Sequence, residues 1–258
     1  MEKGYQEQAI KSACAGGGAG LLSGLLGAGG GSVLVPLLRD WVGLDAKKAM
    51  ATSVFCVAPI CAVSAAAYAA SGRVDWAAAA PYMLGGFLGG AAAGFLFAIT
   101  PPSWLRRGFG VLLLLGAARQ WFPTLGGEAP VWDGFWVSAL AGAAAGVLSG
   151  LGLGGGTVLM IWMTLFGGFS SRHAAQGVNL LYFLPCSLGS MAGHIKNKQV
   201  AFKPALFAIA AGLPLGLLGA FIAQKLDASP LRIGFGVLMV FVGLREVLSA
   251  KQKEPVED

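Results

Sequence analysis

Residues 24–38 read GLLGAGGGSVLVPLL, and residues 149–160 read SGLGLGGGTVLM. Each stretch places three consecutive glycines inside a long apolar segment. Glycine in a helix interior costs ~1 kcal/mol relative to alanine, so each cluster predicts a break between two helical arms. The residue after each cluster, Ser32 or Thr157, carries a hydroxyl group that can cap a helix or bond a ligand. We therefore expect the second arm to begin at Ser32 and at Thr157.

The apolar segments around these clusters are long enough to cross a membrane. Hydrophobic residues make up 56% of the 258 residues and charged residues 12%, whereas soluble domains usually carry about 25% charged residues. A transmembrane helix needs ~20 mostly apolar residues. The sequence therefore predicts an all-α polytopic membrane protein. Charged side chains are absent from residues 12–38, 49–71, 76–105, 134–171 and 204–224.

The second half of the chain repeats the first at an offset of 126 residues. Residues 103–119 read SWLRRGFGVLLLLGAAR, and residues 229–245 read SPLRIGFGVLMVFVGLR, with nine of 17 positions identical. Matching of apolar residues alone would not also reproduce arginine and phenylalanine positions. We therefore predict two membrane repeats, residues 1–125 and 126–258, within one membrane domain.

The glycine-broken segments, residues 12–38 and 134–169, could each cross the membrane once or enter and return to the same side. An arm of ~12 residues rises ~18 Å, which is past the middle of a ~30 Å hydrocarbon core. A single crossing divides Lys and Arg 10 to 8 between the two sides, whereas a returning hairpin divides them 13 to 5. The second division is typical of a cytoplasmic excess. It also predicts that the two repeats are inverted, with both termini in the cytoplasm.

Each repeat is therefore expected to hold a broken, re-entrant helical hairpin and three transmembrane helices. This layout places residues 39–48 and Arg172 on opposite sides of the membrane. Residues 1–11 lack the pattern of a signal peptide, so we expect no cleaved segment there. The transmembrane helices are expected near residues 49–71, 76–99, 103–121, 174–195, 202–224 and 230–248.

The glycine breaks are the strongest candidates for a binding site. Lipid cannot satisfy backbone N–H groups at a break, so they must face protein or a polar cavity. The N-terminal end of a helix favours an anion, and two such ends could hold one without a buried lysine or arginine. The alternative is that the glycines only permit close helix packing and the polar residues only bond neighbouring helices. The predicted substrate-binding residues are Gly29, Gly30, Gly31, Ser32, Thr52, Ser53, Gly154, Gly155, Gly156, Thr157, Gln176 and Asn179.

Other polar residues have more ordinary explanations. His194 could couple transport to protons, but its place two residues before Lys196 favours a surface position at a loop edge. His173 is also expected at a loop, and Arg106 and Arg232 are expected at the membrane interface. No carboxylate lies within a predicted span, which disfavours a cation as substrate. The sequence shows no ATP-binding motif, metal-site spacing or nucleophile–base pairing, so we expect neither an enzyme nor a cofactor.

The chain resembles the TauE/SafE-type sulfite exporters, a group of bacterial membrane proteins. The resemblance rests on the two glycine motifs, on Ala51-Thr52-Ser53 and on Gly72-Arg73-Val74-Asp75, and it covers essentially the whole chain. It implies a secondary transporter of the bacterial cytoplasmic (inner) membrane that exports sulfite, sulfoacetate or a related anion. The second half departs from the pattern at Ile161 and at Gln176-Gly177-Val178-Asn179. Substrate identity therefore stays open.

Two other functions remain alongside the exporter. The first is a channel or uptake protein for another small anion or a neutral sulfur compound, and the second is a membrane scaffold without transport. Saturable exchange would favour the exporter, whereas a scaffold would show no flux and would tolerate alanine in the glycine clusters. The expected partners are a small anionic substrate and the lipid bilayer. The net charge of +6 does not indicate nucleic acid, because Lys and Arg gather in loops, and a homo-oligomer is compatible with the sequence.

Overall fold

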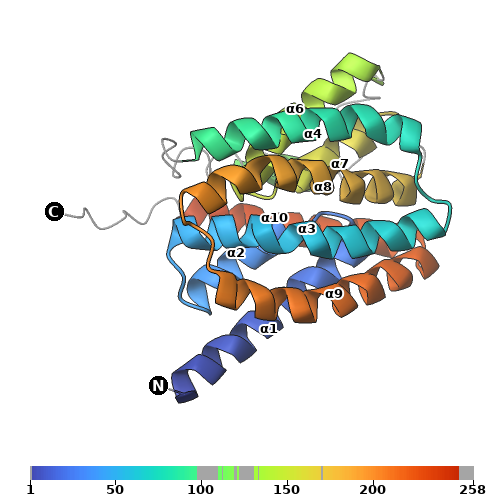
Figure 1. The fold of residues 1–258 in the computed structure, drawn as a ribbon. Coiled ribbons are helices and arrows are strands. Elements are labelled where there is room, and N and C mark those ends of the chain that lie inside the picture. The colour runs from blue at the N-terminus through green and yellow to red at the C-terminus, as the bar shows by residue number, and fades with distance from the viewer. Residues whose placement is uncertain are drawn as a thin grey trace.

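The computed structural model of the chain is a bundle of α-helices (Figure 1). It describes residues 2–97, 110–111, 113–118, 121, 131–132, 134–169 and 171–249, without the side chains of residues 2–4, 228, 232, 246 and 249. No β-strand occurs in this part of the chain, so the predicted all-α fold is confirmed. Most of the span predicted near residues 103–121, with Arg106, lies outside the described residues, as does the side chain of Arg232.

The helices follow the predicted order along the chain. In the first half, α1 and α2 precede two long helices, and a short helical stretch follows at residues 110–111, 113–118 and 121. In the second half, α6 and α7 precede three long helices. The bounds are α1 (Glu2–Leu26), α2 (Gly31–Asp40), α3 (Ala46–Ala70), α4 (Trp76–Leu96), α6 (Phe135–Gly150), α7 (Gly155–Leu165), α8 (Arg172–Lys196), α9 (Phe202–Lys225) and α10 (Ala228–Ser249).

Several helices have the length and composition of membrane spans. Four described helices qualify, namely α1 from Tyr5, α3, α4 and α9. Helix α8 is as long as α3, but it falls outside this group because polar residues interrupt its apolar sequence. Large apolar side chains point outward, with Phe95 83% exposed and Trp136 76% exposed. Such a surface suits lipid, and the chain is a multi-pass membrane protein.

Both broken segments double back on themselves. Tyr5, near the start of α1, packs against Phe207 in the first turns of α9, with ring centroids 6.1 Å apart. Asp40, the last residue of α2, pairs with Arg245 near the end of α10. Figure 1 shows the start of α1 and the end of α2 at the same end of the bundle, which is the geometry of a re-entrant hairpin.

The first arm is longer than the predicted ~12 residues. Helix α1 begins at Glu2 rather than at Ser12 and runs for 25 residues, whereas α2 has 10. No proline interrupts residues 2–26, and a Lys11–Glu7 ion pair of 2.6 Å supports the added turns. The prediction for the start of this arm is therefore wrong.

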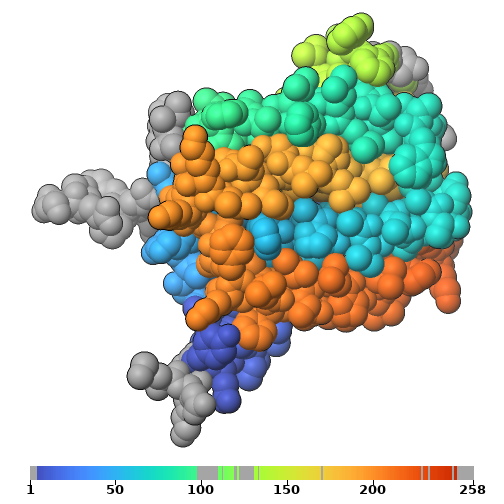
Figure 2. Space-filling view, in the orientation of Figure 1, coloured from blue at the N-terminus to red at the C-terminus, as the bar shows by residue number. Residues whose placement is uncertain are grey.

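Four long helices lie side by side on one face of the bundle. Figure 2 shows them as bands in the order α4, α8, α3 and α9. Glycine permits the close approach, because a Cβ at Gly90 would collide with the carbonyl of Cys186 in α8. A Cβ at Gly94 would lie 3.1 Å from the carbonyl of Ser190, one turn farther along the same contact. The glycines spaced by four in α4 therefore mark one helix contact, as the sequence indicates.

The helix pairs correspond between the two halves. Helix α1 packs along α9, and its counterpart α6 packs along α4 in the same parallel sense. Helices α3 and α8, which are counterparts of each other, pack together. Exchange of the two halves therefore maps these contacts onto one another, as a two-fold axis between them would. The inverted placement across a membrane stays a prediction, and the boundary at residues 125 and 126 lies outside the described residues.

Candidate functional site

The two helix breaks meet inside the bundle. A Cβ at Gly154 would lie 2.8 Å from the Cβ of Ser32, so the start of α2 touches the start of α7. Gly30 and Gly154 precede these helices with left-handed backbone, at φ values of 63° and 80°, which strain any residue with a side chain. Neither helix has a side-chain cap.

The second arms begin earlier than the sequence predicts. Helix α2 starts at Gly31 and α7 at Gly155, one and two residues before Ser32 and Thr157. The left-handed glycine before each helix completes the turn, so a hydroxyl cap is not needed there. The predicted starts are wrong, and the hydroxyl groups lie within the first turn instead.

A small cavity of about 10 Å³ lies between the two breaks. Its lining includes Gly31 and Gly154 from the breaks and the hydroxyl residues Ser53, Ser149 and Ser187 from three different helices. A space of this size holds about one water molecule. The structure therefore shows a closed arrangement around a partly polar pocket.

Four of the twelve predicted site residues carry a buried polar atom without a hydrogen-bond partner. Buried polar groups are normally paired, and each unpaired one costs ~1–3 kcal/mol. Here four of them gather around two helix N-termini, where the first backbone N–H groups also lack intrahelical acceptors. These atoms could bond a ligand without breaking an existing side-chain hydrogen bond. The four atoms are Ser32 Oγ, Ser53 Oγ, Thr157 Oγ1 and Asn179 Oδ1.

Asn179 of α8 bridges the two breaks. Its Nδ2 donates to the carbonyl of Gly27 at 2.6 Å and to the carbonyl of Gly156 at 2.9 Å. One turn earlier, Gln176 Nε2 donates to the carbonyl of Leu25 at 3.1 Å, and Gln176 Oε1 accepts from the Tyr68 hydroxyl at 3.1 Å. Asn179 Oδ1 therefore remains a free acceptor, whereas both polar atoms of the Gln176 side-chain amide already bond protein.

The remaining predicted residues support the breaks from outside the cavity. Thr52 is buried, and its Oγ1 accepts from the N–H of Ala201 at 3.0 Å, which ties α3 to the segment before α9. Gly29 and Gly156 both lie against the ring of Phe183, and a Cβ at either position would collide with that ring. A Cβ at Gly155 would collide with the carbonyl of Ala145, so Gly155 permits α6 and α7 to approach.

Sequence reasoning missed six of the residues that line the cavity, namely Val54, Val57, Ser149, Gly152, Phe183 and Ser187. Ser149 stands in the quoted glycine motif, at the position equivalent to Ser23, and this repetition was the available signal. Phe183 and Ser187 lie in α8 one and two turns beyond Asn179, in a part of the helix where no sequence motif marks them. Their contribution follows from the packing of α8 against both breaks.

His194 is buried, so the prediction of a surface histidine at a loop edge is wrong. Its Nε2 donates to the carbonyl of Gly150 at 2.7 Å, and the ring of Phe97 packs edge-on at 4.5 Å between centroids. The reason is that α8 continues to Lys196, which keeps His194 in the last turn of the helix. His173 does lie at the start of α8, beside a loop.

Comparisons with known proteins agree with a transport function. Residues 12–246 match the family described as Sulfite exporter TauE/SafE. The chain is 29% identical over 126 residues to Probable membrane transporter protein YunE of Bacillus subtilis, a match that covers 46% of each chain. It is 27% identical over 195 residues to Probable membrane transporter protein y4hK of Sinorhizobium fredii, covering 72% of this chain and 77% of that one. The first match thus spans less than half of the relative's length, and no solved structure matches the chain.

Proposed function

From the premise that the chain belongs to the Sulfite exporter TauE/SafE family, and is therefore a membrane transporter rather than an enzyme, we propose that it exports a small sulfur-containing anion. The substrate is sulfite or an organosulfonate such as sulfoacetate. The protein acts as a secondary transporter of the bacterial cytoplasmic membrane, built from inverted repeats at residues 1–125 and 126–258. Each repeat contributes one helix break to a shared site.

The observation that carries this proposal is the group of four unpaired polar atoms at the two breaks. The hydroxyl groups of Ser32, Ser53 and Thr157 can donate to anion oxygens, and the first N–H groups of α2 and α7 add further donors. Asn179 Oδ1 is an acceptor, which suits the protonated oxygen of hydrogen sulfite. No charged side chain of the described residues lines the cavity, so hydroxyl groups and backbone N–H groups hold the anion.

Transport requires this site to open, because the present cavity of about 10 Å³ cannot hold a sulfite ion. The ring of Phe183 lies against both Gly29 and Gly156, so it fills the space beside these two glycines in the closed arrangement. We propose that the anion enters as α2 and α7 move apart from this ring. The left-handed glycines Gly30 and Gly154 then serve as hinge points.

Exchange of radiolabelled sulfite in proteoliposomes tests the proposal. Ser53→Ala and Thr157→Val each remove one unpaired hydroxyl, and each should weaken sulfite affinity by about 10- to 100-fold, because a hydrogen bond to a charged ligand is worth ~1.5–3 kcal/mol. Thermal stability should stay the same or rise, because an unpaired buried group is removed. Saturable exchange would favour a transporter over a channel.

Thr52→Val is the matched control. It also removes one buried hydroxyl from α3, but that hydroxyl accepts from Ala201, so stability should fall by ~1 kcal/mol while affinity is retained. Normal sulfite affinity in both Ser53→Ala and Thr157→Val would place the site elsewhere. Absence of flux for sulfite and for sulfoacetate would overturn the assigned substrate class.

A further inference from the structure

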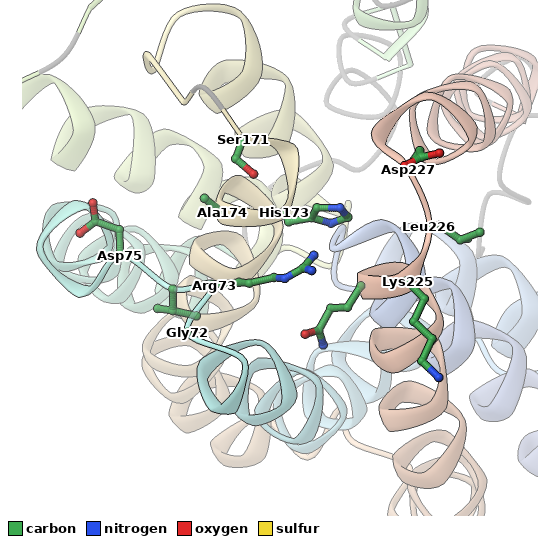
Figure 3. A pocket seen from close by; sticks show the side chains of 11 residues that line it. Gly72, Arg73, Asp75, Ser171, His173, Ala174, Lys225, Leu226 and Asp227 are labelled. Carbon is green, nitrogen blue, oxygen red and sulfur yellow. The ribbon is translucent and has the colours of Figure 1, made fainter.

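A second, larger cleft of about 700 Å³ opens at the end of the bundle opposite the two termini (Figure 3). Three connections line it, from α3 to α4, from α7 to α8 and from α9 to α10. The orientation predicted from loop charges places this end outside the cytoplasm. The cleft is separate from the small central cavity and shares no lining residue with it.

The charged or titratable side chains that line this cleft are Arg73, His173 and Lys225, together with Asp75 and Asp227. Figure 3 shows Arg73, from the connection between α3 and α4, and His173, from the first turn of α8, extending into the same space, while Asp75 points away from it. Asp75 already accepts from the N–H of Ala78 at 3.0 Å as the cap of α4. The backbone N–H of Arg73 donates to the carbonyl of Tyr68 at 3.1 Å, but no described residue pairs with or hydrogen-bonds its guanidinium group. The guanidinium group is therefore available to an anion that enters the cleft.

One side chain, that of Gln176, connects the residues that line the cleft with the first helix break. His173 Nδ1 lies 3.2 Å from Gln176 Oε1. Gln176 in turn covers Gly27, where a Cβ would lie 2.6 Å from its side chain, and it bonds the carbonyl of Leu25. Asn179, one turn deeper, bonds the carbonyl of Gly27. Gln176 thus lies between His173, which lines the cleft, and Gly27 at the first helix break.

The equivalent position in the first repeat has different chemistry. Gly152, the counterpart of Gly27, is covered by Met50, with a Cβ distance of 2.7 Å, and Met50 stands 126 residues before Gln176. Methionine offers no hydrogen-bond donor, whereas the glutamine amide can exchange its protein partners for an oxyanion. Of the two breaks, only the one nearest the cleft therefore packs against a polar side chain, that of Gln176.

We propose that this cleft is an outer vestibule for the transported oxyanion, with Arg73 and His173 as its anion-binding groups and Gln176 as the gate to the central site. This inference rests on the proposed transport function. The ligand is a small oxyanion such as sulfite or a sulfonate. Movement of the Gln176 side chain away from Leu25 and Gly27 connects the two spaces.

Thiol reagents of opposite charge test the vestibule without requiring transport. Cys14, the exposed cysteine among the four, is first replaced by alanine, and Ala174→Cys then places a thiol on the cleft wall. An anionic methanethiosulfonate should modify this thiol faster than a cationic one, and Arg73→Gln should reduce that preference at low salt. Ala77→Cys, exposed at the same end but outside the cleft lining, is the control and should show no effect of Arg73→Gln. Equal rates for the two reagents at Ala174→Cys would overturn the vestibule.

Exchange kinetics test its role in transport. Arg73→Gln should raise the KM for sulfite by up to about fivefold at low ionic strength, and the difference should vanish near 1 M salt, as expected for an exposed charge. Lys48→Gln, at the opposite end of the bundle, should leave KM unchanged. An unchanged KM in Arg73→Gln, while Ser53→Ala still loses affinity, would refute the vestibule and leave the central site intact. If the unmodified protein shows no saturable sulfite exchange, the result would instead refute the proposed function.

The reactivity of a buried thiol tests the proposed Gln176 gate. Gln176→Ala should make a thiol at Ser53→Cys reactive toward the anionic reagent, whereas Met50→Ala should not open that route from the cleft end. Reactivity that is the same with and without Gln176→Ala would show that this side chain does not close the path.

Discussion

Tyr68 and His194 hold equivalent carbonyl groups at the two helix breaks. The Tyr68 hydroxyl donates to the carbonyl of Gly24 at 3.4 Å, and His194 Nε2 donates to the carbonyl of Gly150 at 2.7 Å. The two donors are 126 positions apart in the sequence, and so are the two acceptors. Different side chains thus satisfy the same unpaired carbonyl near the end of α1 and of α6, which extends the sequence repeat to the level of single hydrogen bonds.

The His194 bond should contribute more to stability than the Tyr68 bond. His194→Phe leaves the buried carbonyl of Gly150 without its donor and should lower the free energy of unfolding by ~1–3 kcal/mol. Tyr68→Phe removes one hydroxyl hydrogen that is shared between the carbonyl of Gly24 at 3.4 Å and Gln176 Oε1 at 3.1 Å; Gln176 Oε1 keeps His173 Nδ1 as a donor, so the cost should be ~0.5–1.5 kcal/mol. Thermal unfolding in detergent measures both. A smaller loss in His194→Phe than in Tyr68→Phe would contradict this order.

Much of the fold could be predicted from the sequence, because membrane helices depend on length and apolar composition. The breaks at residues 27–30 and 151–154 followed from glycine clusters, and the α4 contact followed from glycines spaced by four. The start of α1 could not be predicted from charge-free length, since residues 2–11 are helical although several are charged. The length of an apolar segment predicts which part of a helix lies in the membrane. It does not predict how far a polar end of the same helix extends beyond that segment.

The candidate site was only partly predictable. Ser53 and Thr52 are neighbours with similar side chains, yet Ser53 lines the cavity while Thr52 bonds Ala201. Which side of α3 faces the breaks depends on how α3 packs on α8 and α9, and no local pattern in an apolar helix encodes that choice. His194 was misjudged for the same reason, because its burial comes from its contact with α6.

The pairing of Asp40 predicts a pH dependence of stability. Partial burial raises the pKa of Asp40, but hydrogen bonds from Arg39 and Arg245 lower it. The resulting pKa lies below its ordinary value of 3.8. The stabilisation is therefore present above the unfolded pKa and is lost as the pH falls through the folded pKa. Asp40→Asn should lower stability by ~0.5 kcal/mol at neutral pH, because the carboxylate is 52% exposed, and this loss should disappear as the pH falls through the lowered pKa of Asp40.

Asp45→Asn is the control for this measurement. Asp45 pairs with Lys48 at 3.2 Å but is 78% exposed, so its replacement should leave thermal stability unchanged. An equal loss for both variants, or a loss for Asp40→Asn that persists at low pH, would assign the effect to something other than the Asp40 pair.

The two ends of the bundle should face opposite sides of the membrane. Lys48 lies near the start of α3, and Ser171 lies just before α8, at the cleft end. In a Cys14→Ala background, Lys48→Cys should react with an impermeant maleimide only from the cytoplasmic side, and Ser171→Cys only from the outside. Labelling of both from one side would contradict the inverted repeat.

Gly31→Ala should separate ligand binding from packing. Gly31 lines the central cavity, and a Cβ there would lie 3.6 Å from Ser53 Oγ and 3.7 Å from Val57, which is ordinary contact. The variant should therefore fold with near-normal stability while its methyl group occupies space that the anion needs, and sulfite affinity should fall by at least about tenfold. Gly90→Ala provides the contrast, because its Cβ would collide with the carbonyl of Cys186 at the α4–α8 contact, and Gly90 does not line the cavity. It should lower thermal stability while the folded fraction binds sulfite normally. Equilibrium binding and thermal unfolding of both purified variants decide the matter, and normal sulfite affinity in Gly31→Ala would remove the central cavity as the binding site.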